Sequence, residues 1–393
     1  MITKNLYNFN QDDIFLVGKR ANNPKRSFLF ISKLLGKHLA VNPDVVKATG
    51  FLLSSLKYKF ENTSFVECIK NGAIPDYSNK AKDNVLVVGF CETATGLGYA
   101  VASSIEGCTY QTTTREPISG IPKLLSFEEE HSHATTHNMF SNNVNLNDFE
   151  EIILVDDEIS TGNSLLNLIS AIKEKSNIKI FNVMTILDWR KPEQREKFSE
   201  FEQGHNIKIN VFSLIEGVLD EYPTGVIYTN EEEKINTKCV PLLGNLDCLS
   251  RFVAKTTYGK ESYFKNSGRF GVDYEDILKT EEECEKAAEK IIRRQGTVNN
   301  ILILGHGENI YIPSRIAAYI KQKTGCNVEF RTTSLSPIYC DGTVIKDETL
   351  FLDRGNLYHF YNKQDAEKYD KVILLTETSL NVKLCENIVI YDL

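Results

Sequence analysis

The sequence predicts an α/β protein built from two domains. Its 393 residues, 41% of them hydrophobic, are enough to bury a sizeable core and are more than one domain usually contains. Short apolar runs alternate with helical patterns, as they do around a parallel sheet. The polar stretch NEEEKINTK at 230–238 is typical of a linker, so we place the boundary there, with domains at residues 1–232 and 233–393.

Four strands and two helices are expected in the first domain. The strands are short runs of apolar and β-branched residues, and they cover residues 85–90, 108–114, 151–157 and 178–187. Helical patterns follow the first and third runs, at GLGYAVASSI and SLLNLISAIKEK. This alternation favours a parallel sheet flanked by helices.

The segment 116–150 differs from the rest of the first domain. It is polar, rich in His, Asn and Ser, and has no sustained hydrophobic period. A loop of this length inside a compact domain is usually a functional lid or a disordered insert. We therefore expect a long loop here.

The C-terminal part repeats the first in a weak form. LVVGFCETATGLGYAVASSI, followed by TTTREPI, has a counterpart in LILGHGENIYIPSRIAAYI, followed by RTTSLSPI. In each copy an apolar strand ends at Gly (Gly89, Gly305) and a Glu follows three residues later (Glu92, Glu308). A helix and a second strand that ends in Thr-Thr come next. The repeat predicts a second sheet of related fold, with chance similarity between α/β units as the alternative.

Composition excludes several classes of function. The formal net charge of −8 argues against a nucleic-acid-binding surface, because phosphate contacts need clustered Lys and Arg. The nine Cys are scattered singly, which is not the pattern of a disulfide framework or a zinc site, and a reducing cytoplasm is the simpler setting. No stretch approaches the roughly 18 apolar residues of a membrane helix. We expect a cytoplasmic protein that binds a small molecule, with no nucleic acid and no membrane as partner.

The most specific motif is IILVDDEISTGNS at 152–164. Its apolar strand ends at Asp156 and Asp157, which project at the carboxyl edge of the sheet, where open α/β sheets bind ligands. The Ser/Thr/Gly turn that follows offers backbone N–H groups and a helix N-terminus to a phosphate. The carboxylates would repel that phosphate, so they address ribose hydroxyls or a Mg²⁺ ion instead. The alternative, a plain helix N-cap, explains one or two of these residues but not the run.

This motif resembles the PRPP (phosphoribosyl pyrophosphate) site of the type I phosphoribosyltransferases. The resemblance implies their fold, a parallel sheet flanked by helices with a mobile loop and an N-terminal hood. It also implies transfer of ribose 5-phosphate from PRPP to a nitrogenous base, with Mg²⁺ as cofactor and release of pyrophosphate. Asp156 and Asp157 would hold the ribose hydroxyls and the metal, with Glu158 beside them where the family usually has an aliphatic residue. The 5-phosphate would bind at Ile159, Ser160, Thr161, Gly162, Asn163 and Ser164, where Asn163 replaces a common Gly.

Other segments match the same family by their order along the chain. The pyrophosphate loop would comprise Glu92, Thr93, Ala94, Thr95 and Gly96. Arg115 would contact pyrophosphate just before the mobile loop, and in the hood Lys25 and Arg26 would contact the acceptor, unless they are ordinary solvated residues.

Within the mobile loop, EEEHSHATTH stands where Lys-rich text is expected. His131 and His133 are candidate catalytic donors there. His133 with His137 at helical spacing would instead suit a metal, and exposed loop histidines with no role are the third alternative.

Together, GFCETATGLG, TTTREP, EEEHSHATTH, VDDEISTGNS and LDWR are similar to a narrower family. These are the phosphoribosyltransferases of tellurite-resistance (Ter) stress-response clusters, which carry a C-terminal TRSP domain named for Thr-Arg-Ser-Pro. TTSLSPI at 332–338 stands in its place, with Leu335 instead of the Arg. The resemblance implies a nucleotide-like product linked to stress resistance, and the possible homodimer of many type I relatives. Because its second domain has no Asp-Asp motif, we expect no independent transferase activity there.

Two other functions remain open from sequence. A non-catalytic regulator that senses PRPP or a nucleotide would keep the fold, but would need neither Arg115 nor a long loop. A metal-sequestering stress protein would rest on HSHATTH alone, without a spaced carboxylate pair.

Overall fold

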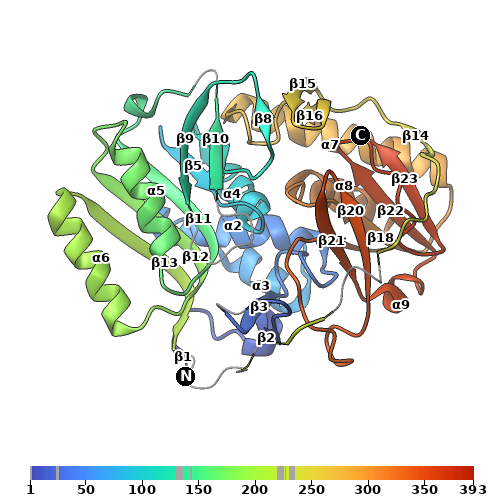
Figure 1. Ribbon diagram of the computed structural model, residues 1–393, viewed down its shortest axis with the longest axis horizontal. Helices are drawn as coiled ribbons and strands as arrows, with labels where there is room; N and C mark the ends of the chain where they lie inside the picture. The colour runs from blue at the N-terminus through green and yellow to red at the C-terminus, as the bar shows by residue number, and fades with distance from the viewer. Residues whose placement is uncertain are drawn as a thin grey trace.

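A computed structural model describes residues 2–23, 26–128, 136–141, 144–218, 225, 227–229 and 235–393. In this part of the chain, a seven-stranded sheet has the order β1-β13-β12-β11-β5-β7-β17, and all of its strands except β17 belong to the first half (Figure 1). The five inner strands are parallel, and the two edge strands run antiparallel to them. The strands are β1 Ile2–Asn5, β13 Lys208–Gly217, β12 Ile180–Asp188, β11 Glu151–Ile159, β5 Leu86–Gly89, β7 Thr109–Thr112 and β17 Val272–Asp273.

Helices cover both faces of this sheet, which explains why β5 and residues 152–155 of β11, at its centre, are wholly apolar. Helices α2 and α4 pack against one face, and α5 and α6 lie on the other side (Figure 1). Their bounds are α2 Pro43–Tyr58, α4 Ala94–Ala102, α5 Asn163–Lys173 and α6 Pro192–His205. Helix α2 begins with Pro43, a residue favoured in the first turn. Asn42 caps it, because its side chain accepts a hydrogen bond from the amide of Asp44 at 3.3 Å. The four predicted strands and the two predicted helices are confirmed.

The described residues of the second half form a five-stranded parallel sheet in the order β14-β23-β22-β18-β19. Helices α7 and α8 pack against each other, and α8 packs against β18 and β19. The strands are β14 Gly244–Asn245, β23 Ile388–Asp392, β22 Lys371–Thr376, β18 Asn300–Gly305 and β19 Asn327–Thr332, and the helices are α7 Tyr274–Gln295 and α8 Tyr311–Thr324.

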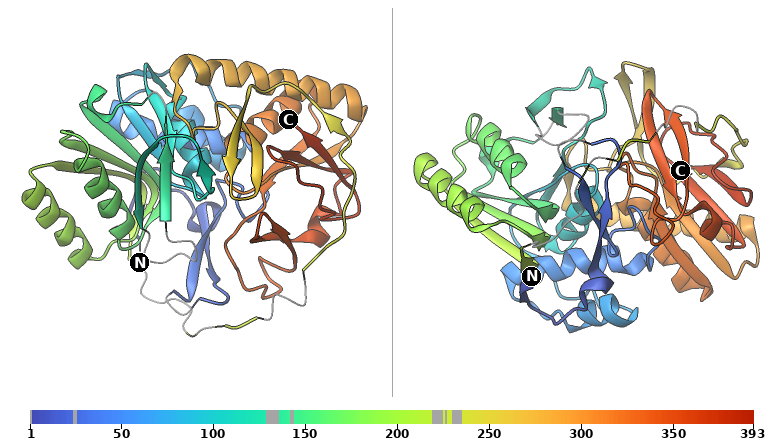
Figure 2. Two further views of the ribbon diagram at one scale, coloured as in Figure 1. Left: turned by 45° about the horizontal axis from the view of Figure 1, so that its top comes forward. Right: turned by 60° about the horizontal axis from the view of Figure 1, so that its bottom comes forward.

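Hairpins and short elements complete the two halves. The hairpin β2–β3 is the N-terminal hood and lies between the halves in both views of Figure 2. The hairpins are β2 Phe15–Lys19 with β3 Phe28–Ser32, β9 Lys123–Glu128 with β10 Thr136–Phe140, β15 Arg251–Thr256 with β16 Gly259–Phe264, and β20 Glu348–Asp353 with β21 Asn356–Tyr361. The short elements are α1 Gln11–Ile14, α3 Thr63–Asn71, β4 Ala81–Lys82, β6 Ile105–Glu106, β8 Ile118–Ser119, the 3-10 turn Leu146–Asp148, and α9 Lys363–Ala366.

The predicted internal repeat is present in the structure. The unit β5–α4–β7 corresponds to β18–α8–β19, and each unit is followed by a hairpin, β9–β10 or β20–β21. The next strand, β11 or β22, then pairs on the other side of the first. The strand order β12-β11-β5-β7 of the first sheet is therefore repeated as β23-β22-β18-β19 in the second.

The two halves are joined by strand pairing and by packing of buried side chains. Strand β17 of the second half extends the first sheet by pairing with β7. In the opposite direction, Val41 pairs with Phe330 of β19 through two hydrogen bonds of 2.9 Å. Between the sheets, the rings of Tyr99 on α4 and Tyr311 on α8 stack with their centroids 4.2 Å apart. The halves therefore form one continuous structure.

One prediction about the fold was wrong, and one lies outside the described residues. The segment expected to be a long loop contains the hairpin β9–β10, in which Leu125 and Phe127 are buried while their neighbours Ser126 and Glu128 are exposed. This alternation of period two was hidden in the polar text around it. The boundary between 232 and 233 lies among residues that the structure does not describe. In the described chain no helix is both long enough and apolar enough to cross a membrane.

Candidate active site

Three consecutive carboxylates lie where β11 extends beyond the end of the neighbouring strand β5. Strand β5 ends at Gly89, opposite Val155, whereas β11 continues beside β12 as far as Ile159. Asp156, Asp157 and Glu158 therefore have no β5 residue beside them, and all three border a cavity of about 440 Å³. The strand was expected to end at the two aspartates, but pairing with β12 carries it two residues further.

The turn after β11 and the start of α5 form the next wall of the cavity. Gly162 has φ of 77°, and a Cβ there would lie 2.4 Å from the ring of Phe198, so the turn requires glycine. Asn163 begins the helix and accepts a hydrogen bond from Lys197 Nζ at 2.6 Å. Asn163 and Ser164, the first residues of α5, border the cavity, and a helix N-terminus favours a negatively charged ligand. All six residues expected to hold a phosphate, 159–164, border the cavity.

Glu158 has a partner in the hood. Arg26 Nη2 lies 2.7 Å from Glu158 Oε1, and the guanidinium packs over the ring of Phe28 at 4.8 Å. Burial raises the pKa of Glu158, Arg26 acts in the opposite direction, and the nearby Asp157 raises it further. The unusual third carboxylate thus fixes the hood to the sheet, while Lys25 lies outside the described residues.

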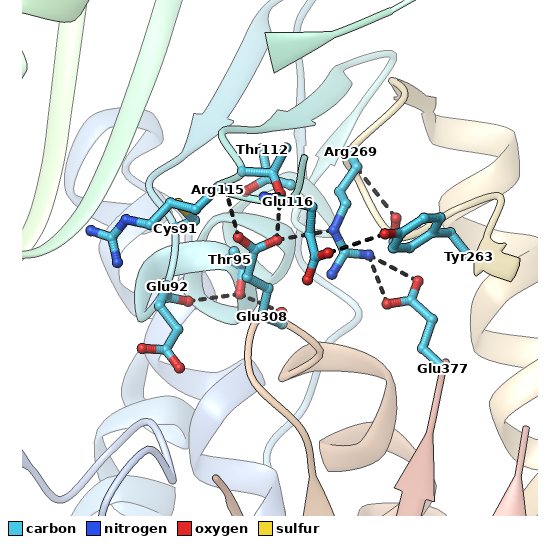
Figure 3. A network of polar contacts seen from close by, with 12 residues as sticks. Cys91, Glu92, Thr95, Thr112, Arg115, Glu116, Tyr263, Arg269, Glu308 and Glu377 are labelled. Carbon is cyan, nitrogen blue, oxygen red and sulfur yellow. Dashed lines mark hydrogen bonds and ion pairs between the residues drawn. The ribbon is translucent and has the colours of Figure 1, made fainter. Parts of the chain in front are cut away.

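The loop after β5 divides between the cavity and the second half. Glu92 and Thr93 border the cavity, and Lys37 Nζ donates to Thr93 Oγ1 at 2.6 Å. Ala94, Thr95 and Gly96 do not border it. Thr95 Oγ1 donates to the Glu308 carbonyl at 2.8 Å (Figure 3), and a Cβ at Gly96 would lie 2.5 Å from Ile310. These residues hold α4 against the second half.

Arg115 borders the cavity on the side next to the second half. Its backbone amide donates to Glu308 Oε1 at 3.0 Å, while its guanidinium points away from that carboxylate (Figure 3). Arg115 Nε donates to Nε2 of the buried His137 at 3.3 Å. His137 therefore orients the Arg115 side chain. His131 and His133 lie outside the described residues.

Sequence reasoning missed two groups of residues around this cavity. The first is in and after the hood and includes Arg20, Phe30 and His38. The second belongs to the second half and comprises Leu335, Ser336, Pro337, Asn356, Leu357 and His359. The repeat of TTTREPI as TTSLSPI was the available signal for the turn 334–337, whereas nothing in the local sequence marked the hairpin.

His38 is the most unusual of these missed residues. It is 3% exposed, and among the described residues neither imidazole nitrogen has a hydrogen-bond partner. Burial lowers its pKa well below the ordinary value, and the charges of Lys37, His359 and Arg20 lower it further. The imidazole is therefore neutral, with one donor and one acceptor beside the cavity.

The carboxylates fit a hard divalent cation. Asp156 and Asp157 offer only oxygen donors, and Asp156 Oδ1 accepts from the amide of Asp157 at 2.9 Å, which fixes its orientation. Among the described residues no group of three or more His, Cys, Asp or Glu side chains gathers to hold a metal. Two carboxylates together with oxygens of a phosphorylated ligand are the usual donor set for Mg²⁺.

Comparison with known proteins agrees with this geometry. A phosphoribosyl transferase family model matches residues 14–218, and a model of the TRSP domain found C-terminal to that transferase matches residues 266–391. No curated protein matches the chain.

Similar solved structures include adenine phosphoribosyltransferases from three organisms. That of Saccharomyces cerevisiae is 14% identical, with 44% of this chain and 81% of that chain covered and a TM-score of 0.25. Those of Trypanosoma brucei (14%, covering 56% and 87%, TM-score 0.32) and Rhodothermus marinus (12%, covering 52% and 96%, TM-score 0.28) are comparable.

The first family match spans just over half of the 393 residues, and the second covers most of the C-terminal half. The resemblance noted in the sequence, to phosphoribosyltransferases that carry a C-terminal TRSP domain, is thereby confirmed. The chain belongs to the phosphoribosyl transferase family, and it carries the TRSP domain as its C-terminal part.

Proposed function

We propose that the protein transfers ribose 5-phosphate from PRPP to a nitrogenous base or base-like acceptor, with Mg²⁺ as cofactor and release of pyrophosphate. One observation carries the proposal. The paired carboxylates at the open end of β11 and the turn that opens α5 border the same cavity, at a volume suited to a small ligand.

In this proposal the ribose hydroxyls and the 5-phosphate bind to two different walls of the cavity. Asp156 and Asp157 accept hydrogen bonds from the ribose hydroxyls, and the N–H groups and hydroxyls of residues 159–164 hold the 5-phosphate. Bound Mg²⁺ would neutralise charge on the pyrophosphate as it departs.

Pyrophosphate would lie on the side of the cavity that carries cations. Lys37 and Arg115 both border the cavity, as does Thr93 of the loop after β5. Donors fixed before the reaction stabilise the charge that develops on a leaving group more than mobile water does.

The acceptor would lie under the hood. Phe30 offers a flat apolar face, fixed by stacking on Trp189 at 5.5 Å, and the neutral His38 offers one donor and one acceptor to a heterocycle. In the reaction the bond from C1 of the ribose to the pyrophosphate oxygen breaks, the bond from C1 to the acceptor nitrogen forms, and the acceptor loses a proton. Water must be excluded to prevent hydrolysis of PRPP.

The wider setting follows from the resemblance noted in the sequence. The product would be a nucleotide-like metabolite made in the cytoplasm and linked to stress or tellurite resistance. The possible homodimer, the catalytic role of His131 and His133, and the domain limits at 232 and 233 remain predictions.

The test is a calorimetric titration of the full chain with PRPP, with and without Mg²⁺. Binding that requires Mg²⁺ supports the proposal and leads to a screen of bases for pyrophosphate release. Binding without release for any base would favour the alternative, a non-catalytic sensor of PRPP. Absence of PRPP binding would refute the proposed site.

A further inference from the structure

The registers of the two sheets fix which residues of the two halves correspond. Val155 of β11 lies opposite Gly89, the last residue of β5. In the second sheet Leu374 lies opposite Leu304, so the next residue of β22 faces Gly305. Asp156 and Asp157 therefore correspond to Thr376 and Glu377.

The contacts between the halves are reciprocal. Glu92 of the first half accepts a hydrogen bond from the amide of Leu335, in the TTSLSPI turn of the second, at 3.2 Å. Glu308 of the second half accepts one from the amide of Arg115, in the TTTREPI turn of the first, at 3.0 Å. The two equivalent glutamates thus each bind the equivalent turn of the other half, as in a dimer with a two-fold axis.

A matching pair of glycines extends this relation. The amide of Thr332 donates to the carbonyl of Gly36 at 2.7 Å, and the amide of Thr112 donates to the carbonyl of Gly268 at 2.9 Å. Both glycines have positive φ, 68° and 95°, and each would place a Cβ against an aromatic ring of the strand it binds. Each strand is therefore capped by a segment from the opposite half.

The cation that follows each glycine differs in its partners. Lys37 Nζ lies 3.6 Å from Glu92, and Lys37 borders the open cavity. Arg269 Nε donates to Glu308 at 2.9 Å, and its Nη1 donates to both carboxylate oxygens of Glu377, at 2.9 and 2.8 Å (Figure 3).

Arg269 therefore closes the site that the second half would have. It neutralises Glu377, the residue that corresponds to Asp157, and both Arg269 and Glu377 are less than 10% exposed. The Nη1 of Arg269 bonds both oxygens of Glu377, so it takes the place that a ligand of this carboxylate would need.

The second half nevertheless borders the open cavity of the first. Its turn 334–337 is tied to β21, because Ser334 and His359 exchange backbone hydrogen bonds of 3.0 and 2.8 Å. The turn is also tied to the hood, since the amide of Ala21 donates to the Pro337 carbonyl at 3.1 Å. These contacts make the turn and the hairpin β20–β21 one fixed wall.

The hairpin end of this wall lies on the Arg115 side of the cavity. Arg354 Nη1 donates to Glu116 Oε2 at 2.6 Å, and Glu116 is the chain neighbour of Arg115. Asn356, two residues after Arg354, borders the cavity with its side chain exposed. Arg115 is the residue that the proposed function assigns to pyrophosphate.

From these contacts we propose that the C-terminal half is a built-in partner, a second copy of the fold whose own site is closed by Arg269 and whose hairpin forms the pyrophosphate wall of the single site. The proposal rests on the proposed function, because it takes PRPP as the ligand. It assigns to Asn356 a place beside the pyrophosphate and to the chain a single PRPP site.

A charge placed at Asn356 tests this assignment. Asn356→Asp keeps the side-chain shape and adds a negative charge, which should weaken binding of Mg²⁺–pyrophosphate and of PRPP about fivefold, whereas Asn356→Lys should strengthen both. Ribose 5-phosphate lacks the pyrophosphate, so its affinity should change less than about twofold. Leu352→Asp is the matched control, because Leu352 lies on the same hairpin, is 54% exposed and does not border the cavity.

Calorimetry on the full-length chain reads out both affinity and stoichiometry. The expected result is one PRPP per chain, with opposite shifts for the two Asn356 variants and none for the control. Two PRPP per chain, or unchanged pyrophosphate affinity in both Asn356 variants, would overturn the built-in partner while leaving the transferase proposal intact. A wild-type chain that binds ribose 5-phosphate but neither PRPP nor pyrophosphate would instead remove the proposed function on which this inference rests.

Discussion

The two halves of the chain place a carboxylate at the same point of the same fold and give it opposite surroundings. Asp157 is partly exposed at an open cavity, and a turn and a helix N-terminus follow it. Glu377 is 6% exposed and is held by Arg269. Between β22 and β23, where the structure describes every residue, no helix corresponds to α5.

This difference shows how little separates a ligand site from a structural core. A carboxylate that binds a ligand must not be neutralised by a cationic side chain of the protein, because the ligand itself is to be its partner. Once Arg269 takes that place, the same position stabilises the fold instead. Substitutions at the two positions should therefore have opposite consequences, one for stability and one for binding.

The largest effect is expected at the buried position. Glu377→Gln removes one member of a buried ion pair and leaves Arg269 with Glu308 as its remaining carboxylate, which should lower the free energy of unfolding by about 3 kcal/mol or more. Urea denaturation measures this loss. Glu386→Gln, at a side chain that is 71% exposed, is the control and should change stability by less than about 0.5 kcal/mol.

At the open position, the same kind of substitution should affect ligand binding. Asp157→Asn removes a charged acceptor from the ribose hydroxyls and the metal, so the affinity for Mg²⁺–PRPP should fall about a hundredfold. The free energy of unfolding should remain within about 0.5 kcal/mol of wild type, because a partly exposed carboxylate stabilises little. Retained PRPP affinity in this variant would show that the two carboxylates do not have the different roles assigned here.

A smaller, pH-dependent effect is expected at His38, whose position in the other half is occupied by Phe270. Burial, with Lys37, His359 and Arg20 nearby, lowers the pKa of folded His38, while the unfolded chain takes up a proton below about pH 6.5. Stability from this residue is therefore present above that pH and is lost as the pH falls.

His38→Phe should remove this dependence. Between pH 7 and pH 5 the wild-type chain should lose about 2 kcal/mol more unfolding free energy than the variant. Denaturant titrations at the two pH values make the comparison, and equal losses would mean that folded His38 is protonated.

The fold was largely predictable from the sequence because its signals are local. The central strands β5, β11 and β12 contain apolar runs, and the proposed phosphate-binding side of the site is one contiguous segment, so residues 156–164 come together in any fold that forms that strand and helix. The repeat of the strand and Thr-Thr pattern gave the second sheet as well.

The rest of the site depends on contacts between distant segments. Asn356 and His359 reach the cavity only because the two halves face each other, and no property of their own neighbours indicates it. Glu158 had no local explanation either, since its partner Arg26 is 132 positions earlier in the printed sequence. The hairpin β9–β10 was missed because its alternating apolar residues stand within a polar, His-rich segment.

The duplication within one chain also has a consequence for how such a protein changes over time. When two identical chains pair, every substitution appears in both subunits, so a change that suits one side of the contact is imposed on the other. Here Lys37 and Arg269, or Leu335 and Arg115, are encoded separately. Each copy is free to accept changes that its counterpart would not tolerate, and the contact between them does not weaken on dilution, because both halves belong to one polypeptide.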